Sequence, residues 1–230
     1  MSEKVNCKII NSNTHQFLFE NVPINLVNML RREILTNVET WAVEYVGIHE
    51  NGTNFPDEIV SHRLSMVPLT IKNPKLYENG YTFSVEIIGR QIVTARQLFK
   101  DTEIILLFEG DINLFTISTN KSLSLEITVQ IGTMKEHAKW QSCIIYHDSN
   151  VDFKKKDGFT IFDENTTKLF KNALQHYKKI ISKKSNAIKN CQEHSPIYEN
   201  TILTIEQIHQ YTPKQLLHFG FEFILKLSNL

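Results

Sequence analysis

Apolar residues near the N-terminus recur every three or four positions, which is the spacing of one helix face. They are Ile24, Val27, Leu30 and Ile34. Asn21 is a candidate cap for this helix, and we expect the helix to end near Asn37. The pattern also predicts two short strands over residues 4–10 and 16–20 before the helix, and a strand over residues 41–49 after it.

The middle of the chain alternates between apolar and polar residues, as strands with one buried face do. We expect mostly β structure from residue 81 to residue 131, and a further strand over residues 143–146. The clearest alternation is Leu123, Leu125, Ile127, Val129 and Ile131. A short helix is predicted before this region, from Pro56 through Leu64.

Helical spacing returns toward the C-terminus. A long helix with lysines opposite its apolar stripe fits residues 166–184, and a loop over 185–197 and a strand over 201–208 follow it. The residues from Thr212 to Gln215 fit a capping box that opens a last helix. Apolar residues surround most of this helix, so either it lies deep in its own core or it packs against another chain. The pattern alone leaves both interpretations open.

The composition is that of a globular protein of one or two domains, with 230 residues and 22% charged residues. Its 25 basic and 25 acidic residues give zero formal net charge, which argues against autonomous nucleic-acid binding. No apolar run is long enough to cross a membrane, and the first residues lack a signal-peptide pattern. The bias toward Lys, Asn and Ile suggests an AT-rich source, such as a parasite or a virus.

Motifs for catalysis or metal binding are missing from the sequence. It contains none of the common phosphate-binding, nucleophile-elbow or zinc-protease motifs, so we expect no active site and no cofactor on this chain. The three cysteines form no C-x-x-C pair, and residues 70–130 contain none, so we expect no metal there. Cys191 with His194 offers only two ligands, which we interpret as incidental.

Three segments carry a combined family signature. The first is N-M-L-R-R-E over residues 28–33, the second is P-D-E-I-V-S-H-R-L-S-M-V-P-L over residues 56–69, and the third is K-E-H-A-K-W over residues 135–140. In order and spacing they resemble segments of the alpha-like RNA polymerase subunits. That family includes the third-largest subunit of RNA polymerase II, its shared equivalent in polymerases I and III, and the archaeal D subunit, with bacterial alpha as a distant relative.

The resemblance implies an α+β fold with a discontinuous alpha-like dimerisation domain and an inserted, mostly-β domain. We expect residues 1–47 and 151–230 to form the first and residues 48–150 the second. It also implies a smaller alpha-like subunit that packs on the N-terminal and C-terminal helices. The residues expected in that contact are Leu30, Leu216, Phe223 and Leu227.

The same resemblance implies contacts with the largest and second-largest polymerase subunits through Arg31, Arg32, His62 and Arg63. Without the resemblance, Arg31 and Arg32 would be interpreted as a solvated pair and His62 as a locally bonded surface histidine. For His137, Lys139 and Trp140, the alternatives are a loop with a half-buried Trp and a docking loop anchored by Trp140. The family favours docking.

These observations predict a non-catalytic assembly subunit of DNA-dependent RNA polymerase that makes no sequence-specific contact with nucleic acid. The alternative is a stand-alone protein-binding adaptor that keeps the fold outside a polymerase. The expected location is the nucleus for a cellular eukaryotic protein, and the host cytoplasm or the virion for a viral one.

Overall fold

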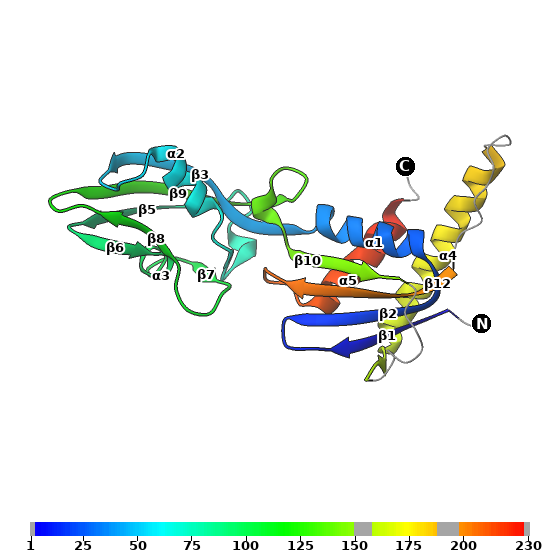
Figure 1. Ribbon diagram of the computed structural model, residues 1–230. Coiled ribbons are helices and arrows are strands. Elements are labelled where there is room, and N and C mark those ends of the chain that lie inside the picture. The colour runs from blue at the N-terminus through cyan, green and yellow to red at the C-terminus, as the bar shows by residue number, and fades with distance from the viewer. Residues whose placement is uncertain (1–2, 150–157, 188–197, 228–230) are drawn as a thin grey trace. The chain divides into compact units, whose positions relative to one another are not determined.

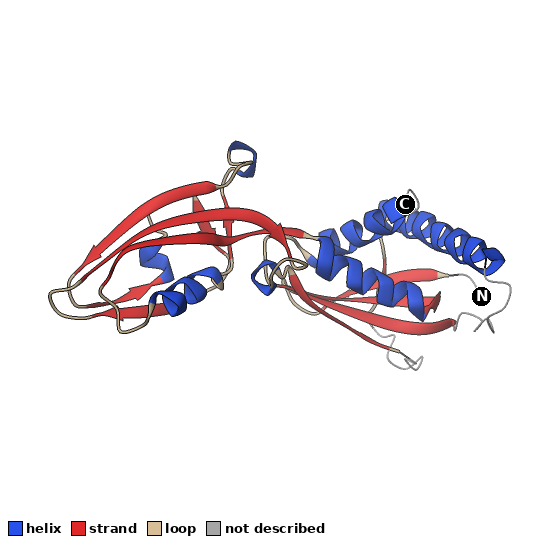
Figure 2. Cartoon of the chain, turned by 90° about the horizontal axis from the view of Figure 1, so that it is seen from above, coloured by secondary structure: helices blue, strands red, loops and turns tan. Residues whose placement is uncertain are grey.

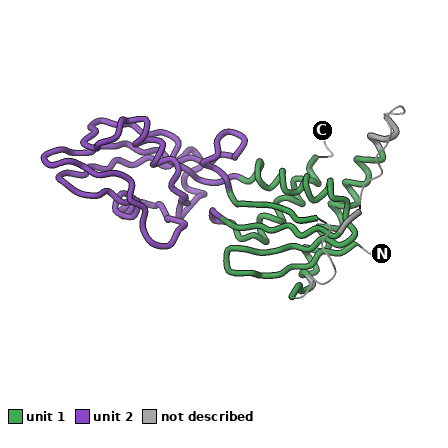
Figure 3. The backbone as a smooth tube through the Cα atoms, viewed as in Figure 1, with its two compact units in different colours: residues 1–38, 142–207, 211–230 green, residues 39–141, 208–210 purple. Residues whose placement is uncertain are grey.

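The computed structural model describes residues 3–149, 158–187 and 198–227, and for residues 161, 183–187 and 198–199 it describes the backbone only. The chain forms two compact units, which Figure 3 shows in separate colours. Unit 1 contains residues 1–38, 142–207 and 211–230, and unit 2 contains residues 39–141 and 208–210. Cys191 and His194, the incidental ligand pair of the sequence, lie outside the described residues.

Unit 1 is a five-stranded antiparallel sheet covered by three helices. The spatial order of its strands is β10-β12-β2-β1-β11. The sheet thus joins the N-terminal strands β1 and β2 to strands from the second half of the chain. They are β1 (Lys4–Ile9), β2 (Thr14–Pro23), β10 (Cys143–Asp148), β11 (Thr160–Ile161) and β12 (Tyr198–Gln207). The helices are α1 (Ile24–Asn37), α4 (Glu164–Ala187) and α5 (Pro213–Lys226). Figures 1 and 2 show the three helices against one face of the sheet.

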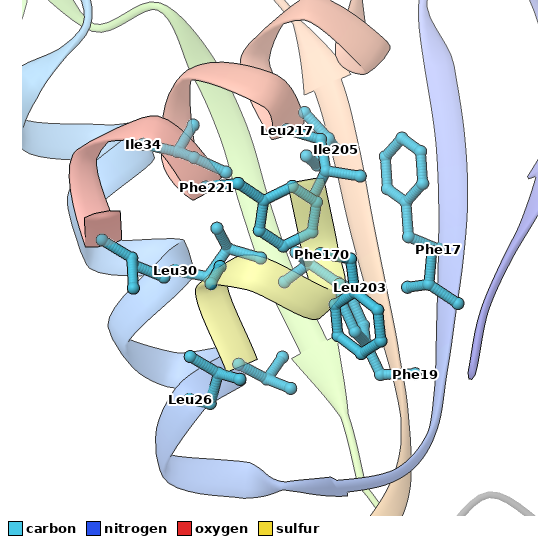
Figure 4. Close-up of a cluster of buried hydrophobic side chains, with 14 of the residues drawn as sticks. Phe17, Phe19, Leu26, Leu30, Ile34, Phe170, Leu203, Ile205, Leu217 and Phe221 are labelled. Atoms are coloured by element: carbon cyan, nitrogen blue, oxygen red, sulfur yellow. The ribbon is translucent and has the colours of Figure 1, made fainter. Parts of the chain in front are cut away.

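The core of unit 1 fills the space between this sheet face and the helices. Figure 4 shows Phe19 of β2, Phe170 of α4 and Phe221 of α5 meeting in it. The Phe170 and Phe221 rings lie 5.9 Å apart, and the Phe19 and Phe221 rings 6.5 Å. These tilted and edge-on pairs suit the quadrupoles of aromatic rings. Three elements that are far apart in the sequence are therefore fixed by one aromatic cluster.

Helices α1 and α5 cross at Gly220. A Cβ added at this glycine would lie 2.5 Å from Cδ1 of Leu30 and 2.7 Å from Cγ1 of Ile34, so the crossing has no room for a larger residue. The side of α5 that faces the sheet and α1 is buried within the chain. Part of the all-round apolar pattern of α5 is therefore explained by its own core.

The expected cap of α1 is wrong, although the predicted end of the helix at Asn37 matches the structure. The residue before the first helical position is Pro23, and no side chain caps the helix. Asn21 instead has a φ of 55°, and its backbone N–H donates to Oδ1 of Asn200 at 3.2 Å. Pairing of β2 with β12 continues up to Pro23, so the helix begins directly from the end of a strand. By contrast, the predicted capping box is present at Thr212 and Gln215 of α5.

Unit 2 is mostly β. A three-stranded sheet, β3-β9-β5, is accompanied by the pairs β4-β7 and β6-β8. The strands are β3 (Glu39–Asn51), β4 (Leu69–Ile71), β5 (Tyr81–Ile88), β6 (Gln91–Thr94), β7 (Ile104–Leu106), β8 (Asn113–Ile117) and β9 (Ser122–Thr133). The helices are α2 (Asp57–Ser65) and α3 (Ala95–Leu98), with the 3₁₀ turns η1 (Pro74–Leu76) and η2 (Ala138–Trp140). The alternating residues predicted for β9, apart from the exposed Ile131, point into this unit's own core.

The boundaries between the units differ from the predicted ones at residues 47/48 and 150/151. Strand β3 pairs with β9 from Glu39 onward, so residues 39–47 belong to the β unit. Strand β10 pairs with β12, so residues 143–148 belong to unit 1. In both places the strand with which a segment pairs decides the unit to which it belongs. The sequence pattern of one strand does not reveal which strand that is. Residues 185–187, predicted as loop, continue α4, and residues 188–197 lie outside the described part.

Candidate docking surfaces

The first candidate surface is the side of α5 that borders α1. Phe223 and Leu227 follow Gly220 by three and seven residues, so they share the side of the helix on which α1 crosses. Both are half-buried, as is Phe219 one turn earlier, and Phe219 and Phe223 pack on the core without being enclosed by it. This α5 stripe of Phe219, Phe223 and Leu227 leaves apolar surface uncovered.

Two of the predicted contact residues on these helices are not on that surface. Leu30 and Leu216 are 1% and 0% exposed, because they fill the core between the helices and the sheet. The expectation that their side chains contact a partner is wrong, since a fully enclosed side chain offers no area to another chain. They instead hold the helices at a spacing that leaves Phe223 and Leu227 half-buried.

The two arginines of α1 differ in their surroundings. Arg31 is half-buried, and its Nε and Nη2 donate to Oδ1 of Asn28 at 3.2 and 2.9 Å. It precedes Ile34 by three residues, which places it toward the α5 crossing. Arg32 is exposed, and within the described residues its guanidinium makes no hydrogen bond or ion pair. Arg32 is the freer of the two for a contact with another chain.

The second candidate surface lies on α2. Ile59, His62, Arg63 and Met66 occupy one face of this helix at spacings of three, four and seven residues, and all four are exposed. Phe55, just before the helix, lies under Arg63, whose guanidinium carbon is 5.3 Å from the ring centroid. We call these five residues the α2 patch. The opposite face, with Val60 and Leu64, is completely buried.

The apolar half of the α2 patch escaped the sequence analysis, which singled out His62 and Arg63 only. Phe55, Ile59 and Met66 are 37%, 42% and 48% exposed. A signal was available: on a helix that buries Val60 and Leu64, a residue at position 59 or 66 turns away from the core. Arg63 is held in place by a further bond, from its Nη2 to the backbone oxygen of Asn113 at 3.1 Å. The patch thus presents a fixed cation among apolar side chains.

Trp140 is not the exposed anchor that the sequence suggested. It is 4% exposed, and its indole ring lies on Gly132 of β9, where an added Cβ would overlap the ring. Its Nε1–H donates to the backbone oxygen of Gln130 at 3.4 Å, and its own backbone oxygen accepts from Oγ1 of Thr40 at 2.9 Å. The interpretation as a docking anchor is wrong because these contacts within unit 2 enclose the ring.

Trp140 therefore fastens the loop over residues 135–139 to the sheet. Lys139 lies 4.3 Å from the Trp140 ring centroid and forms an ion pair with Glu44, with only 9% of its side chain exposed. His137 is exposed, and its Nδ1 accepts from the backbone N–H of Lys139 at 3.1 Å. Of the three predicted residues in this loop, only His137 presents its side chain fully to the outside.

One buried titratable group lies in unit 2 near the start of β4. His209 is 4% exposed, and its Nδ1 has no hydrogen-bond partner among the described residues. Burial lowers the pKa of His209 to about 4, and a hydrogen bond to the backbone of Leu69 opposes this shift. His209 is therefore neutral at ordinary pH. The next residue, Gln210, accepts a short hydrogen bond from Oγ1 of Thr70.

Two further absences concern only the residues that the structure describes. No group of three or more His, Cys, Asp or Glu side chains is arranged to hold a metal ion. No helix there combines the length and the apolar character that a membrane crossing requires. Of the two cysteines described, Cys143 is buried, and burial raises the pKa of its thiol to about 11.

Comparison with known proteins decides the family. The model described as the RNA polymerase Rpb3/Rpb11 dimerisation domain matches residues 16–226. The chain belongs to this family. The match includes residues from all three segments of unit 1 and all of unit 2, so the predicted α+β fold class and the resemblance found in the sequence are confirmed.

Several archaeal polymerase subunits are similar to this chain. The DNA-directed RNA polymerase subunit Rpo3 of Pyrococcus furiosus is 32% identical over 139 residues, which are 57% of this chain and 53% of that protein. The Rpo3 of Methanocaldococcus jannaschii is 33% identical over 130 residues, which are 56% of this chain and 66% of that protein. The chain thus spans about half the length of the Pyrococcus relative that it matches.

Proposed function

We propose that this chain is a non-catalytic subunit of a multi-subunit DNA-dependent RNA polymerase, and that its task is assembly. The observation that supports this most is the family match over residues 16–226, in a chain whose similar proteins carry the name of a polymerase subunit. The structure adds two surfaces with uncovered apolar area, the half-buried α5 stripe and the exposed α2 patch, which suit contacts with other chains.

The α5 stripe is the proposed contact with a smaller alpha-like subunit. Phe223 and Leu227 lie beside the α1 crossing, so a helix pair from another chain can cover both helices at once. Burial of the exposed parts of these side chains stabilises the contact by about 25 cal/mol per Å² of apolar area. Arg31 and Arg32 lie on the adjoining helix α1, and we assign them to a contact with a large subunit, as the family resemblance implies.

The α2 patch and His137 are the proposed contacts with the two large subunits. Arg63 is held by Phe55 and by the backbone oxygen of Asn113, so it loses little side-chain entropy when it binds. His62 lies beside it, and Ile59 and Met66 add apolar area on both sides. Arginine surrounded by apolar residues is a frequent composition of the central part of protein interfaces.

The test is purification of the tagged protein from its native source, followed by mass spectrometry of the proteins that remain bound. The proposal predicts one small alpha-like partner and two chains above about 100 kDa, the size expected of large polymerase subunits. Replacing both Phe223→Glu and Leu227→Glu should remove the small partner, because each carboxylate would be buried without a counter-charge. The matched control is Leu76→Glu with Ile88→Glu, two exposed apolar positions of unit 2.

The adaptor alternative makes a different prediction for the same experiment. A stand-alone adaptor would be recovered with an unrelated partner and without large polymerase subunits. Replacing exposed residues of the α2 patch, as in Ile59→Ser with Met66→Ser, would then leave transcription unchanged. If the tagged protein is recovered alone, the polymerase proposal is wrong. Microscopy of the tagged protein would then test its place: the nucleus for a cellular eukaryotic subunit, or the host cytoplasm or virion for a viral one.

A further inference from the structure

The long helix α4 has an outward face without exposed apolar side chains. Between Glu164 and Ser182 the exposed positions are all polar or charged. They are Glu164, Asn165, Lys168, Lys171, Asn172, Gln175, Lys178, Lys179 and Ser182. The apolar residues of the helix, such as Phe170, Leu174 and Tyr177, turn into the core of unit 1. None of the surfaces proposed above uses this face.

The lysines of α4 are gathered on that face. At 3.6 residues per turn, about 100° of the helix circumference contains all four of Lys168, Lys171, Lys178 and Lys179. At 1.5 Å per residue they span about 16 Å of helix length. The single carboxylate among the exposed residues between Glu164 and Ser182 is Glu164, in the first turn of the helix, where it is favoured by the macrodipole.

Most of this positive charge is not neutralised within the described part of the chain. Only Lys178 has an ion-pair partner there, Glu3, with 2.6 Å between Nζ and Oε1. The hydrogen bond from Lys178 lowers the pKa of the Glu3 carboxyl. The Nζ atoms of Lys168, Lys171 and Lys179 make no hydrogen bond or ion pair with the residues that the structure describes.

A neighbouring pocket does not explain the lysines. A pocket of about 550 Å³ reaches Lys171, but its wall also contains Lys4, Glu3 and Glu20. Two carboxylates balance two ammonium groups there, so the pocket has no preference for an anion. The excess of positive charge lies along the helix surface, which points to a long polyanion and not to a small ligand in the pocket.

We propose that this face of α4 binds the phosphate backbone of a nucleic-acid duplex, without regard to sequence. The central part of protein–protein contacts is typically enriched in aromatic residues and depleted in lysine, whereas the exposed positions of this face are all polar or charged and include four lysines. Phosphate contacts need only cations and polar groups, and lysine binds phosphate as a point charge that suits any sequence. The zero net charge of the chain, which argues against strong autonomous nucleic-acid binding, keeps this contact weak and local.

The test is fluorescence anisotropy of the full chain with a labelled duplex DNA of arbitrary sequence, at a series of salt concentrations. The α4 variant carries Lys168→Gln, Lys171→Gln, Lys178→Gln and Lys179→Gln, which keep helix propensity and remove four charges. Its affinity should fall at least about tenfold at moderate salt, and the slope of log K against log salt should fall by about 3. Circular dichroism checks that the variant is folded.

The matched control removes four exposed lysines of unit 2, at positions 72, 75, 100 and 121. It changes the net charge equally, and its affinity for the duplex should stay close to that of the unaltered chain. If the unaltered chain does not bind, or if both variants lose affinity alike, the proposal is wrong. The same measurement with polyglutamate tests an acidic protein partner. If the α4 variant loses affinity for polyglutamate but keeps its affinity for the duplex, the proposal is likewise wrong.

The proposal can fail independently of the polymerase assignment. The α4 variant should still be recovered with the small partner and the large subunits, because α4 contributes no residue to the α5 stripe or the α2 patch. A variant that loses these subunits while duplex affinity is unchanged would show that the lysines serve assembly, and this also contradicts the proposal.

Discussion

The loop over residues 135–140 and the helix α2 both carry motifs of the same family. The loop buries its tryptophan in the protein, whereas the helix exposes its conspicuous side chains to solvent. The loop places Trp140 on Gly132, where the ring is 4% exposed. Helix α2 places His62, Arg63 and Met66 outward. The difference teaches that a motif marks an important segment without telling whether its side chains hold the fold or meet another chain. That distinction depends on which face of the helix a residue occupies and on which backbone lies beside it, as Gly132 does beside Trp140.

The largest expected effect on stability comes from the buried Trp140. Trp140→Ala should lower the free energy of unfolding of unit 2 by about 3 kcal/mol, because it leaves a cavity over Gly132 and frees the loop. The measurement is denaturant unfolding followed by the emission of Trp41, the other tryptophan of the chain, which also lies in unit 2. A change below about 0.5 kcal/mol would show that the ring is not enclosed and would restore its role as an anchor.

A second, smaller effect concerns the buried His209. Its pKa is about 4 in the folded protein, whereas an unfolded histidine has a pKa near 6.5, so the unfolded chain binds the proton more tightly. The stabilisation is therefore complete above about pH 6.5 and is lost as the pH falls toward 4. The free energy of unfolding should fall by an amount on the order of 2 kcal/mol over this pH range. The measurement is denaturant unfolding at several pH values, monitored by tryptophan emission.

The matched variants for this experiment are His209→Gln, which removes the titrating group, and His49→Gln, an exposed position of the same unit. The first should flatten the dependence of stability on pH between 6.5 and 4, and the second should leave it as it is. Equal pH dependence in all three proteins would mean that His209 is accessible to protons in the folded state.

The smallest effect on stability is expected for the exposed residues of the α2 patch. Ile59→Ser with Met66→Ser on α2 should change the free energy of unfolding by less than about 0.5 kcal/mol per site, because both side chains already face solvent. The same variant should reduce recovery of the large subunits at least about tenfold if the patch lies at the centre of that contact. A large loss of stability with unchanged subunit recovery would reverse the assignment of the two regions.

Much of the architecture follows from local sequence signals. The stripe from Ile24 to Ile34 and the capping box at Thr212 gave the helices α1 and α5 at nearly their observed bounds, because their signals lie within one helix. The alternation around Leu125 gave β9 for the same reason. Helix α3 was missed, and β6 was not distinguished within the β region expected over residues 81–131, because eight residues of mixed character, Gln91 to Leu98, contain no full period of either structure.

What the sequence could not give is the identity of each segment's neighbour. The unit boundary at Glu39 depends on pairing with Thr133, which is 94 positions away by the numbering of the two residues. The burial of Trp140 depends on a glycine opposite it, and the burial of Leu216 depends on a crossing with α1 at Gly220. The candidate site was therefore predicted at the level of segments. Of the six expected contact residues on α5 and in the loop, Leu216 and Trp140 are buried, Phe223, Leu227 and Lys139 are half-buried, and His137 alone is exposed.

The most direct test of the account is hydroxyl-radical footprinting of the chain, first alone and then in the assembly recovered from its source. The account predicts that oxidation of Phe223 and Met66 drops when the chain is assembled, since both belong to proposed contacts, while Trp140 stays protected in both states. Unchanged oxidation of Phe223 and Met66, together with a Trp140 that is reactive alone and protected in the assembly, would contradict it.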